Sequence, residues 1–328
     1  MEIKTIKKIG VLTSGGDAPG MNAAIRATVR AGFYYNLEMY GIYRGYEGMI
    51  NDDIKKLDSK NIAHVLERGG TFLKSARSAE FRTKEGRQKA YDNLKKHGID
   101  ALVVIGGDGS LTGAHLFFQE FGIPAIGLPG TIDNDLSGTD STIGFDTACN
   151  TAIQAIDKIR DTATSHDRLF FVEVMGRDAG FIAINAGIGS AAAATLIPEK
   201  KMPIERLVER LKARTKALKQ SNIVIVAEGG KSGGAAEIAS KIKKQLPYYD
   251  IKVTILGHLQ RGGSPTSFDR VLASKLGVAA VEGLMQGKYD VMAGIINNKI
   301  VFTPITKAIV DDKEVDEDDF RIAKILST

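Results

Sequence analysis

Short apolar runs that stop at glycine recur along the chain, and each is followed by a stretch in which apolar residues return at helical spacing. The runs lie at residues 9–16, 101–107, 125–130, 169–176 and 223–230. The helical stretches lie at residues 20–35, 83–97, 110–121, 142–163, 203–219, 234–245 and 266–286. Strands that alternate with helices predict an α/β fold with mainly parallel sheets covered on both faces. In such sheets ligands bind beyond the carboxyl ends of the strands, where these glycine turns lie.

The length of the chain, 328 residues, predicts about two domains. A boundary is expected near residue 144, where a long predicted helix begins. Its apolar positions keep helical spacing at Phe145, Ala148, Ala152, Ile156 and Ile159. The acidic segment 311–320 is expected to be a solvated surface element or turn.

The composition, 43% hydrophobic and 25% charged residues, is typical of a soluble globular protein. No apolar run approaches the roughly 18 residues of a membrane span, and the amino terminus shows no signal segment, so we expect a cytoplasmic protein without a membrane partner. The net charge of +5 is spread along the chain, which favours solvated surface over nucleic-acid binding but also suits a phosphate-rich substrate. The single Cys149 excludes an internal disulfide and favours a core cysteine over a nucleophile.

The strongest phosphate signal is "VVIGGDGSLTGA", which follows a predicted strand. Gly106, Gly107 and Gly109 let backbone amides approach oxyanions, and Ser110 begins a predicted helix whose amino terminus favours negative charge. Asp108 would repel bare phosphate, which favours a cation such as Mg²⁺ between them. A tight turn with a capping aspartate is the alternative.

A second glycine turn, Gly15 and Gly16, ends the first predicted strand and again precedes a helix. Two such turns at neighbouring strand ends suggest a polyphosphate held from two sides. After a third glycine pair, "GGTFLKSARSAEFR" adds Arg77 and Arg82, which suit adjacent phosphates unless they are ordinary surface residues.

The segment "PAIGLPGTIDNDLSGTD" places polar residues directly after an apolar strand. Asp133 and Asp135, with Asn134 between them, are candidates for metal ligands or for a general base with an orienting group, and an Asx-rich turn is the alternative. The neighbouring Thr131 hydroxyl favours a site.

Two further strand ends carry groups that suit a second phosphorylated ligand. Arg177 follows the run "VEVMG", and His258 and Arg261 lie in "LGHLQRGGSP". The histidines show no zinc spacing. "NAGIGSAAAA" matches a dinucleotide turn only weakly, and small-residue packing is favoured there.

In this order, the motifs resemble those of the bacterial ATP-dependent 6-phosphofructokinase family over most of the chain. They are "GVLTSGGDAPGMNAAIR", "RGGTFLKSAR", "ALVVIGGDGS", "GLPGTIDND", "VEVMGR" and "LGHLQRGGSP". The resemblance implies two similar three-layer α/β/α domains with the active site in the cleft between them, assembled as a homotetramer. It implies an ATP-binding domain at 1–144 plus about 260–310 and a sugar-phosphate-binding domain at 145–259 plus about 311–328.

The resemblance implies transfer of phosphate from ATP, with Mg²⁺, to the 1-hydroxyl of fructose 6-phosphate. Asp133 matches the catalytic base beside Thr131, Asp135 an acid of the metal region, and Asp108 the Mg²⁺-binding acid. Other catalytic matches are Gly16, Arg77 and Arg177. ATP contacts match Gly16, Tyr46, Arg77, Ser78, Arg82, Gly107, Asp108, Gly109 and Ser110. Sugar-phosphate contacts match Thr131, Asp133, Arg168, Met175, Gly176, Arg177, Glu228, Lys252, His258 and Arg261, with Arg168 contributed to a neighbouring subunit.

Two positions bear on the phosphoryl donor. Family members that use pyrophosphate tend to carry an acid where Gly109 stands and a lysine where Gly130 stands, so ATP is expected here. A pyrophosphate-dependent enzyme and a non-catalytic nucleotide sensor of the same fold are the alternatives. The chain retains both the position of the catalytic base and that of the metal ligand, which argues against a non-catalytic sensor.

The resemblance also implies an effector site, but some residues there differ from those that the family carries. Its phosphate-binding positions match Arg26, Arg30, Arg160 and Lys219. Ala193, Ala217 and Ser59 stand where the family carries an acidic residue, a basic residue and an arginine. Weakened or altered regulation by ADP or phosphoenolpyruvate is therefore expected. Lys252 replaces an arginine and loses its forked geometry, so sugar affinity is expected to be lower.

Overall fold

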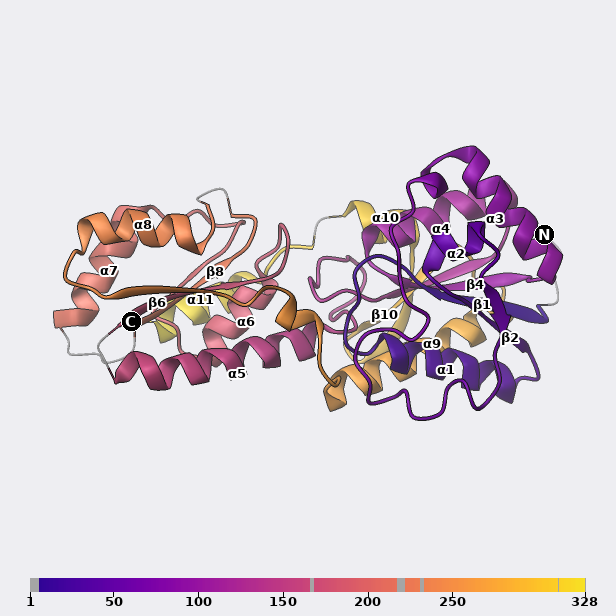
Figure 1. Cartoon of the computed structure of the whole chain (residues 1–328), viewed down its shortest axis with the longest axis horizontal. Helices are drawn as coiled ribbons and strands as arrows, with labels where there is room; N and C mark the ends of the chain where they lie inside the picture. The colour runs from indigo at the N-terminus through magenta and orange to yellow at the C-terminus, as the bar shows by residue number, and fades with distance from the viewer. Residues whose placement is uncertain (1–5, 166–167, 217–221, 231–232, 312, 328) are drawn as a thin grey trace. The chain divides into compact units, whose positions relative to one another are not determined.

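The computed structural model describes residues 6–165, 168–216, 222–230, 233–311 and 313–327. Contacts within the chain divide it into two compact units (Figure 1). Unit 1 comprises the residues up to Ile132, Leu136–Asp146 and Arg261–Lys313, and unit 2 comprises Asp133–Asp135, Thr147–Gln260 and the residues from Glu314 onward. The limits expected from the sequence placed Asp133–Asp135 in the ATP-binding domain, whereas their contacts group them with unit 2.

Unit 1 is built on a seven-stranded sheet in the order β11-β10-β5-β4-β1-β2-β3. Its strands are β1 (Lys8–Thr13), β2 (Glu38–Ile42), β3 (Ile54–Lys56), β4 (Ala101–Gly106), β5 (Ala125–Pro129), β10 (Val291–Ile296) and β11 (Lys299–Pro304). The two edge strands, β3 and β11, pair antiparallel, and the strands between them run parallel. Every residue of the central strand β4 is buried, as an all-apolar run covered on both faces requires.

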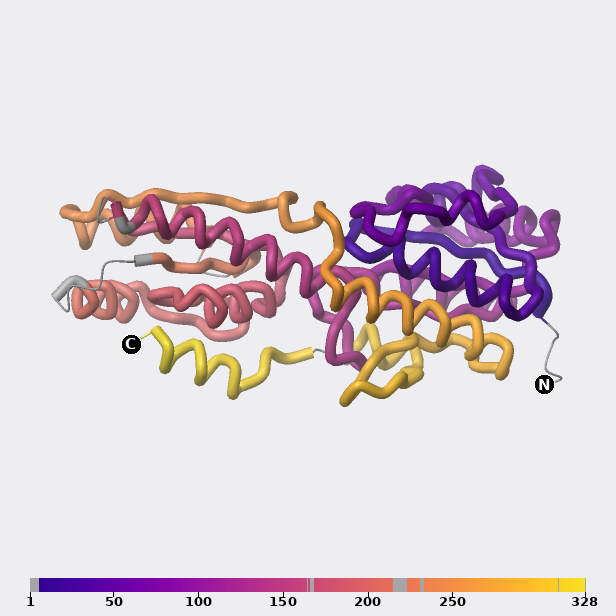
Figure 2. Tube along the Cα trace, turned by 90° about the horizontal axis from the view of Figure 1, so that it is seen from below, coloured from indigo at the N-terminus to yellow at the C-terminus, as the bar shows by residue number. Residues whose placement is uncertain are grey.

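Helices cover both faces of this sheet. α1 (Met21–Tyr34) and α9 (Ser267–Met285) pack side by side on one face, as Figure 2 shows. The other face carries α2 (Gly45–Ile50), η1 (Glu80–Arg82), α3 (Lys84–His97), α4 (Asp108–Phe121) and α10 (Ile305–Val310), whose apolar sides share one core with the sheet. α3 begins as its sequence predicts, because the Thr83 hydroxyl accepts a hydrogen bond from the amide of Gly86 at 3.1 Å.

Unit 2 is built on a four-stranded parallel sheet in the order β7-β8-β6-β9. The strands are β6 (Leu169–Val174), β7 (Ala194–Leu196), β8 (Asn222–Ala227) and β9 (Ile251–Ile255). The helices of this part of the chain are α5 (Phe145–Thr164), α6 (Phe181–Gly189), α7 (Ile204–Lys216), α8 (Ala235–Gln245) and α11 (Glu317–Leu326), and a short turn of helix, η2 (Gly257–Arg261), follows β9. The predicted α/β fold with mainly parallel sheets is confirmed.

The helix α6 was not evident in the sequence pattern of unit 2, whereas the close packing at Gly187 and the exposed acidic segment were expected. α6 is largely buried and apolar apart from the exposed Asn185, so it lacks the alternation of an amphipathic helix. Within it, a Cβ on Gly187 would lie 2.2 Å from the Thr195 hydroxyl, so the glycine there serves close packing. The acidic segment, expected to be a solvated surface element or turn, is exposed or half-buried over its described residues and leads into α11, which Asp316 caps by accepting a hydrogen bond from the amide of Asp318 at 2.8 Å. No described helix is long and apolar enough to cross a membrane.

Candidate active site

The turns after β1 and β4 pack against each other. The two strands are parallel neighbours, and the Ser14 amide donates to the Ile105 carbonyl at 3.0 Å. A Cβ on Gly106 would lie 2.5 Å from Ser110 Oγ and 2.6 Å from the Ser14 carbonyl oxygen. Only glycine permits this approach, so the two phosphate-binding candidates of the sequence form one surface.

The β4 turn leads directly into α4. Gly107 is the residue before the helix, and the amides of Ser110 and Leu111 bond to its carbonyl. Asp108 and Gly109 therefore occupy the first turn, two residues earlier than the predicted start, and both are exposed. The first amides of a helix have no intrahelical acceptor and favour an anion.

Tyr46 supports this turn from beneath. It is only 5% exposed, its hydroxyl donates to the Ser110 carbonyl at 2.6 Å, and its ring stacks on Phe81 with centroids 4.0 Å apart. Burial raises the pKa of the Tyr46 phenol, so it remains a hydrogen-bond donor at neutral pH. Tyr46 is placed to position Ser110 from the core.

The loop that carries Arg77 and Ser78 is fastened to the first turn. Ser75 Oγ donates to the Gly15 carbonyl at 2.8 Å, and Thr13 Oγ1 donates to the Lys74 carbonyl at 2.9 Å. Ser78 Oγ accepts from the Phe81 amide at 3.2 Å, while Arg77 and Arg82 are exposed. Asn22, which the sequence did not single out, also anchors the loop by accepting from the Phe72 amide at 2.8 Å.

Arg261 lies over Gly16. A Cβ on Gly16 would lie 2.7 Å from Arg261 Nη1, and the same nitrogen donates to the Asp17 carbonyl at 3.3 Å. The arginine assigned to the sugar phosphate by resemblance is therefore beside a turn assigned to the nucleotide. His258, three residues earlier, is exposed.

Thr131 stands against the β4 turn. A Cβ on Gly107 would be 3.7 Å from Thr131 Cβ, and the Gly130 amide donates to the Gly106 carbonyl at 3.1 Å. Thr142 Oγ1 holds the segment by donating to the Thr131 carbonyl at 2.6 Å. The ends of β1, β4 and β5 thus meet within unit 1.

The acidic residues beyond Thr131 form a turn. Asp133 is 3% exposed, Asn134 is 5% exposed with φ of 54°, and Asp135 is partly buried. A residue in the left-handed region breaks the alternation of an extended chain, so the rule that would place both carboxylates on one side does not apply. A carboxyl group this deeply buried requires polar partners, as catalytic carboxylates commonly have.

In unit 2, Glu228 organises the turn after β6. Its Oε1 accepts from the Arg177 amide at 2.9 Å and from the Gly176 amide at 3.3 Å. Arg177 has φ of 54° and is exposed. The Met175 amide donates at 3.3 Å to Gln260, which is fully buried and which the sequence gave no reason to select.

Arg168 and Lys252 lie at the opposite end of the same sheet. Arg168 immediately precedes β6, and Lys252 pairs with Phe170 at its beginning. Lys252 Nζ is 3.0 Å and Arg168 Nε 2.8 Å from the carboxylate of Asp250, and together they hold the pKa of Asp250 below its usual range. The length of β6 separates this pair from Met175, Gly176 and Arg177.

The residues expected at an effector site belong to both units. Arg26 and Arg30 lie on α1, Ser59 is exposed, Arg160 lies on α5 and donates to the Ser190 carbonyl, and Ala193 is buried. Lys219 and Ala217 lie outside the described residues.

Among the described residues no group of three or more histidine, cysteine or acidic side chains is arranged to hold a metal. Asp108 is an exposed carboxylate in the first turn of α4, at the amino terminus of that helix. This donor set fits Mg²⁺, which typically binds one or two carboxylates together with substrate phosphates and water.

Known proteins were compared with this chain. The Phosphofructokinase family matches residues 8–284. "ATP-dependent 6-phosphofructokinase 2" of Bacteroides thetaiotaomicron is 59% identical over 98% of this chain and 99% of that protein, and "ATP-dependent 6-phosphofructokinase" of Cytophaga hutchinsonii is 56% identical over 98% of each. The solved phosphofructokinase of Saccharomyces cerevisiae is 40% identical with a TM-score of 0.89 over 92% of this chain, which spans 45% of the yeast chain. The chain therefore belongs to the phosphofructokinase family.

Proposed function

We propose that this chain is an ATP-dependent 6-phosphofructokinase of the cytoplasm that transfers the γ-phosphoryl group of ATP to the 1-hydroxyl of fructose 6-phosphate in glycolysis. The observation that carries the proposal is the meeting of the β1 and β4 glycine turns with Thr131, with buried Asp133 two residues beyond. The names of the bacterial relatives support the same activity.

The residues of the nucleotide site contribute by positioning the phosphates of ATP and by neutralising their negative charge. We expect the amides near Gly16 and at residues 107–109 to bind phosphate oxygens, and the exposed Arg77 and Arg82 to pair with the same phosphates. Tyr46 acts through the Ser110 carbonyl as a positioning residue. These groups are arranged before substrate binds, so little reorganisation is needed during transfer.

The acceptor side needs a base and a sugar-phosphate site. Asp133 accepts the proton of the 1-hydroxyl, and Thr131 orients that hydroxyl. Arg177 stabilises charge on the transferred group, and the turn that carries it is held by Glu228. Met175, Gly176, His258 and Arg261 complete the sugar-phosphate contacts.

Asp108 would hold Mg²⁺, with Asp135 near the metal's surroundings. The ion, when bound with ATP, supplies charge neutralisation for the phosphates. Asp108 then contributes binding of the ion, and the helix amides behind it bind the phosphate oxygens.

Gly109 and Gly130 favour ATP over pyrophosphate for different steric reasons. A Cβ on Gly109 would meet nothing within 4 Å, so the position is open to a ligand. A Cβ on Gly130 would lie 2.9 Å from Ile105 Cγ2 and 3.1 Å from Met21 Cε, so a lysine there would require the core to shift.

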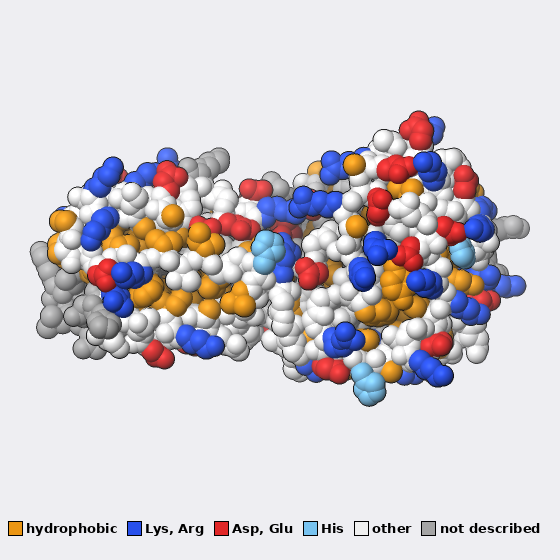
Figure 3. All heavy atoms as spheres, in the orientation of Figure 1, with side chains coloured by type: hydrophobic (Ala, Val, Ile, Leu, Met, Phe, Trp, Pro, Cys, Tyr) orange, Lys and Arg blue, Asp and Glu red, His pale blue; other side chains and the backbone are white. Residues whose placement is uncertain are grey.

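A homotetramer is part of the proposal. Arg168 and Lys252 lie at the end of the unit 2 sheet remote from Arg177, which suits residues that serve a neighbouring subunit. The edge strand β9 also exposes two apolar side chains: Val253 and Ile255 are 39% and 59% exposed, and apolar side chains gather on this face of unit 2 in Figure 3. Exposed apolar edges typically pack against another chain.

Weak or altered regulation is also proposed. Arg26, Arg30 and Arg160 retain positive charge, but Ala193 and Ser59 cannot supply the charged contacts expected there. Titration with ADP and phosphoenolpyruvate at low fructose 6-phosphate tests this, and strong responses of the usual kind to both would contradict it.

One assay tests the main proposal. Purified protein is supplied with fructose 6-phosphate and Mg²⁺, and formation of fructose 1,6-bisphosphate is coupled to a dehydrogenase with either ATP or pyrophosphate as donor. Turnover with ATP alone is expected. Turnover with pyrophosphate would favour the other donor class, and nucleotide binding without turnover would favour a sensor.

A further inference from the structure

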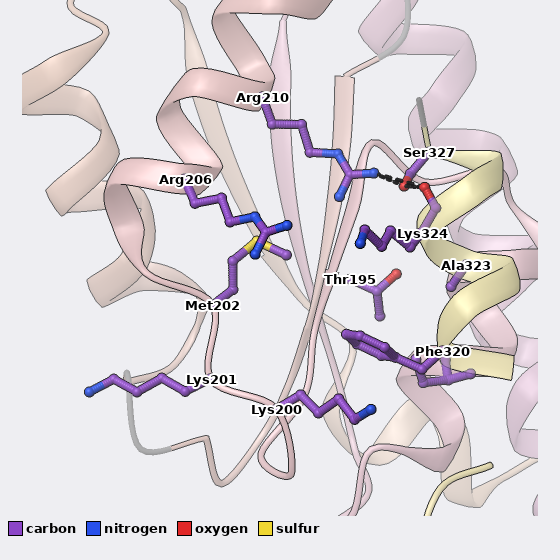
Figure 4. A pocket seen from close by; sticks show the side chains of 11 residues that line it. Thr195, Lys200, Lys201, Met202, Arg206, Arg210, Phe320, Ala323, Lys324 and Ser327 are labelled. Atoms are coloured by element: carbon purple, nitrogen blue, oxygen red, sulfur yellow. Dashed lines mark hydrogen bonds between the residues drawn. The ribbon is translucent and has the colours of Figure 1, made fainter. Parts of the chain in front are cut away.

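Unit 2 contains a basic cavity of about 240 Å³ that none of the roles above uses. Its walls come from α6, α7, α11, β7 and the segment after β7 (Figure 4). Its charged lining residues are Lys200, Lys201, Arg206, Arg210 and Lys324. No carboxylate occurs among the described residues that line it.

Three of these cations converge. Figure 4 shows the guanidinium groups of Arg206 and Arg210 and the Lys324 amino group directed toward the same space, into which Thr195 also points. Lys201 points away from it. Arg206 and Arg210 lie four residues apart on α7, a spacing at which like charges repel.

Two polar groups at the carboxyl end of α11 accept hydrogen bonds from one of these cations, Arg210. Arg210 Nη2 donates to the Lys324 carbonyl at 3.2 Å and to the Ser327 hydroxyl. Burial, together with repulsion from Arg214 and Arg206, lowers the pKa of Arg210. Neutral acceptors offset the desolvation of one guanidinium but leave a net positive cavity, which favours an anion.

The remaining wall is apolar. Phe320, Ala323, Met202 and Ile184 also line the cavity, and Figure 4 shows Met202 beside the Arg206 guanidinium and Phe320 below Thr195. Lys200 closes one end, with its amino group paired to Glu317 and 4.4 Å from the centroid of the Phe320 ring. A cavity that combines apolar side chains with converging donors is the arrangement of a small-molecule site, and the volume suits a ligand of one ring or a few carbons.

We propose that this cavity binds a small organic phosphate ester, with its phosphoryl group among Arg206, Arg210 and Lys324 and its carbon portion against Phe320 and Met202. None of the described residues that line it is among those proposed for catalysis or expected at the effector site. Both the arginine forks and the apolar wall contribute to recognition.

The test uses phenyl phosphate as probe and isothermal titration calorimetry on the full chain. Substituting Arg206→Gln together with Lys324→Gln is expected to weaken the binding of phenyl phosphate at least tenfold. Lys201→Gln, which removes the same charge from a side chain that points away, serves as the matched control and is expected to leave the affinity within twofold. Equal affinity of the wild type and the double variant, or equal loss in the control, would overturn the proposal.

Two further measurements keep the result interpretable. Inorganic phosphate is expected to bind at least fivefold more weakly than phenyl phosphate, and equal affinities would refute the role of the apolar wall. The melting temperature and the turnover of each variant with ATP and fructose 6-phosphate are expected to match the wild type. Loss of turnover in the double variant would refute the separation of this site from the active site.

Discussion

Substituting Gly16→Ala probes how Arg261 is held over the β1 turn. Gly16 is not among the glycines with positive φ, so an alanine fits the backbone. Its Cβ would nevertheless lie 2.7 Å from Nη1 and 3.2 Å from Cζ of Arg261. Since ordinary contacts between such atoms are about 3.5 Å, the guanidinium must retreat by roughly 1 Å.

This displacement is expected to lower the catalytic efficiency much more than the stability of the protein. Misplacing a positioning group by about 1 Å costs up to ~10²-fold in rate, or about 2.7 kcal/mol. We therefore expect kcat/KM for fructose 6-phosphate to fall by about 10–100-fold. Because the atoms that move are the end of a flexible side chain, we expect the free energy of unfolding to change by less than about 1 kcal/mol.

A double-mutant cycle with Arg261→Lys supplies the control. The Arg261→Lys variant has no guanidinium at this position, so adding Gly16→Ala is expected to lower its kcat/KM by no more than about threefold. The coupled assay gives kcat/KM for the four proteins, and thermal unfolding gives their stability. An equal loss from Gly16→Ala in both backgrounds would refute the reasoning.

Three other substitutions test separate parts of the site. Asp133→Ser is expected to lower turnover by about 10²–10⁴-fold with ATP affinity nearly unchanged, as measured by the coupled assay and nucleotide titration, and near-normal turnover would remove the base assignment. Gly106→Ala forces Cβ to within 2.6 Å of the Ser14 carbonyl oxygen and is expected to cost about 1–3 kcal/mol in urea unfolding, so an unchanged midpoint contradicts it. Glu120→Gln removes a paired contact at 2.7 Å with the largely buried Arg87 and is expected to cost about 1–2 kcal/mol at pH 7. Arg87 lowers the pKa of Glu120, so the pair's contribution is full above the unfolded pKa of about 4.3 and is lost as pH falls through the lower folded value; a stability difference as large at pH 3 as at pH 7 contradicts this.

Much of the fold was predictable because the strands of a covered parallel sheet are continuous apolar runs. β4 is an example, since each of its residues is buried and its sequence contains no polar residue. α6 was not predictable, because a helix surrounded by core has no polar face to set its period. The short strand β7 has too few residues for any pattern.

The site was predictable where glycine marks a close approach. Gly106 and Gly16 can be selected from the glycine-rich motifs of the sequence, and the structure shows that crowding leaves no space for a larger side chain at either position. Gln260 and Asn22 could not be selected, since a buried amide has no sequence signature and acquires its role from backbone groups far along the chain. Tyr46 was selected as an ATP contact, and only packing places it beneath Ser110 in the core.

The sequence by itself determined the fold class, the family and the residue types available for phosphoryl transfer, because these follow from local periodicity and from motifs of consecutive residues. Only the tertiary structure decided which groups meet. Packing places Arg261 against Gly16 and leaves the length of β6 between Lys252 and Arg177. The backbone turns at Asn134, so the directions of the Asp133 and Asp135 side chains do not follow from their spacing in the sequence. The physical reason is that contacts between residues distant in sequence depend on how strands and helices pack, which no local pattern encodes.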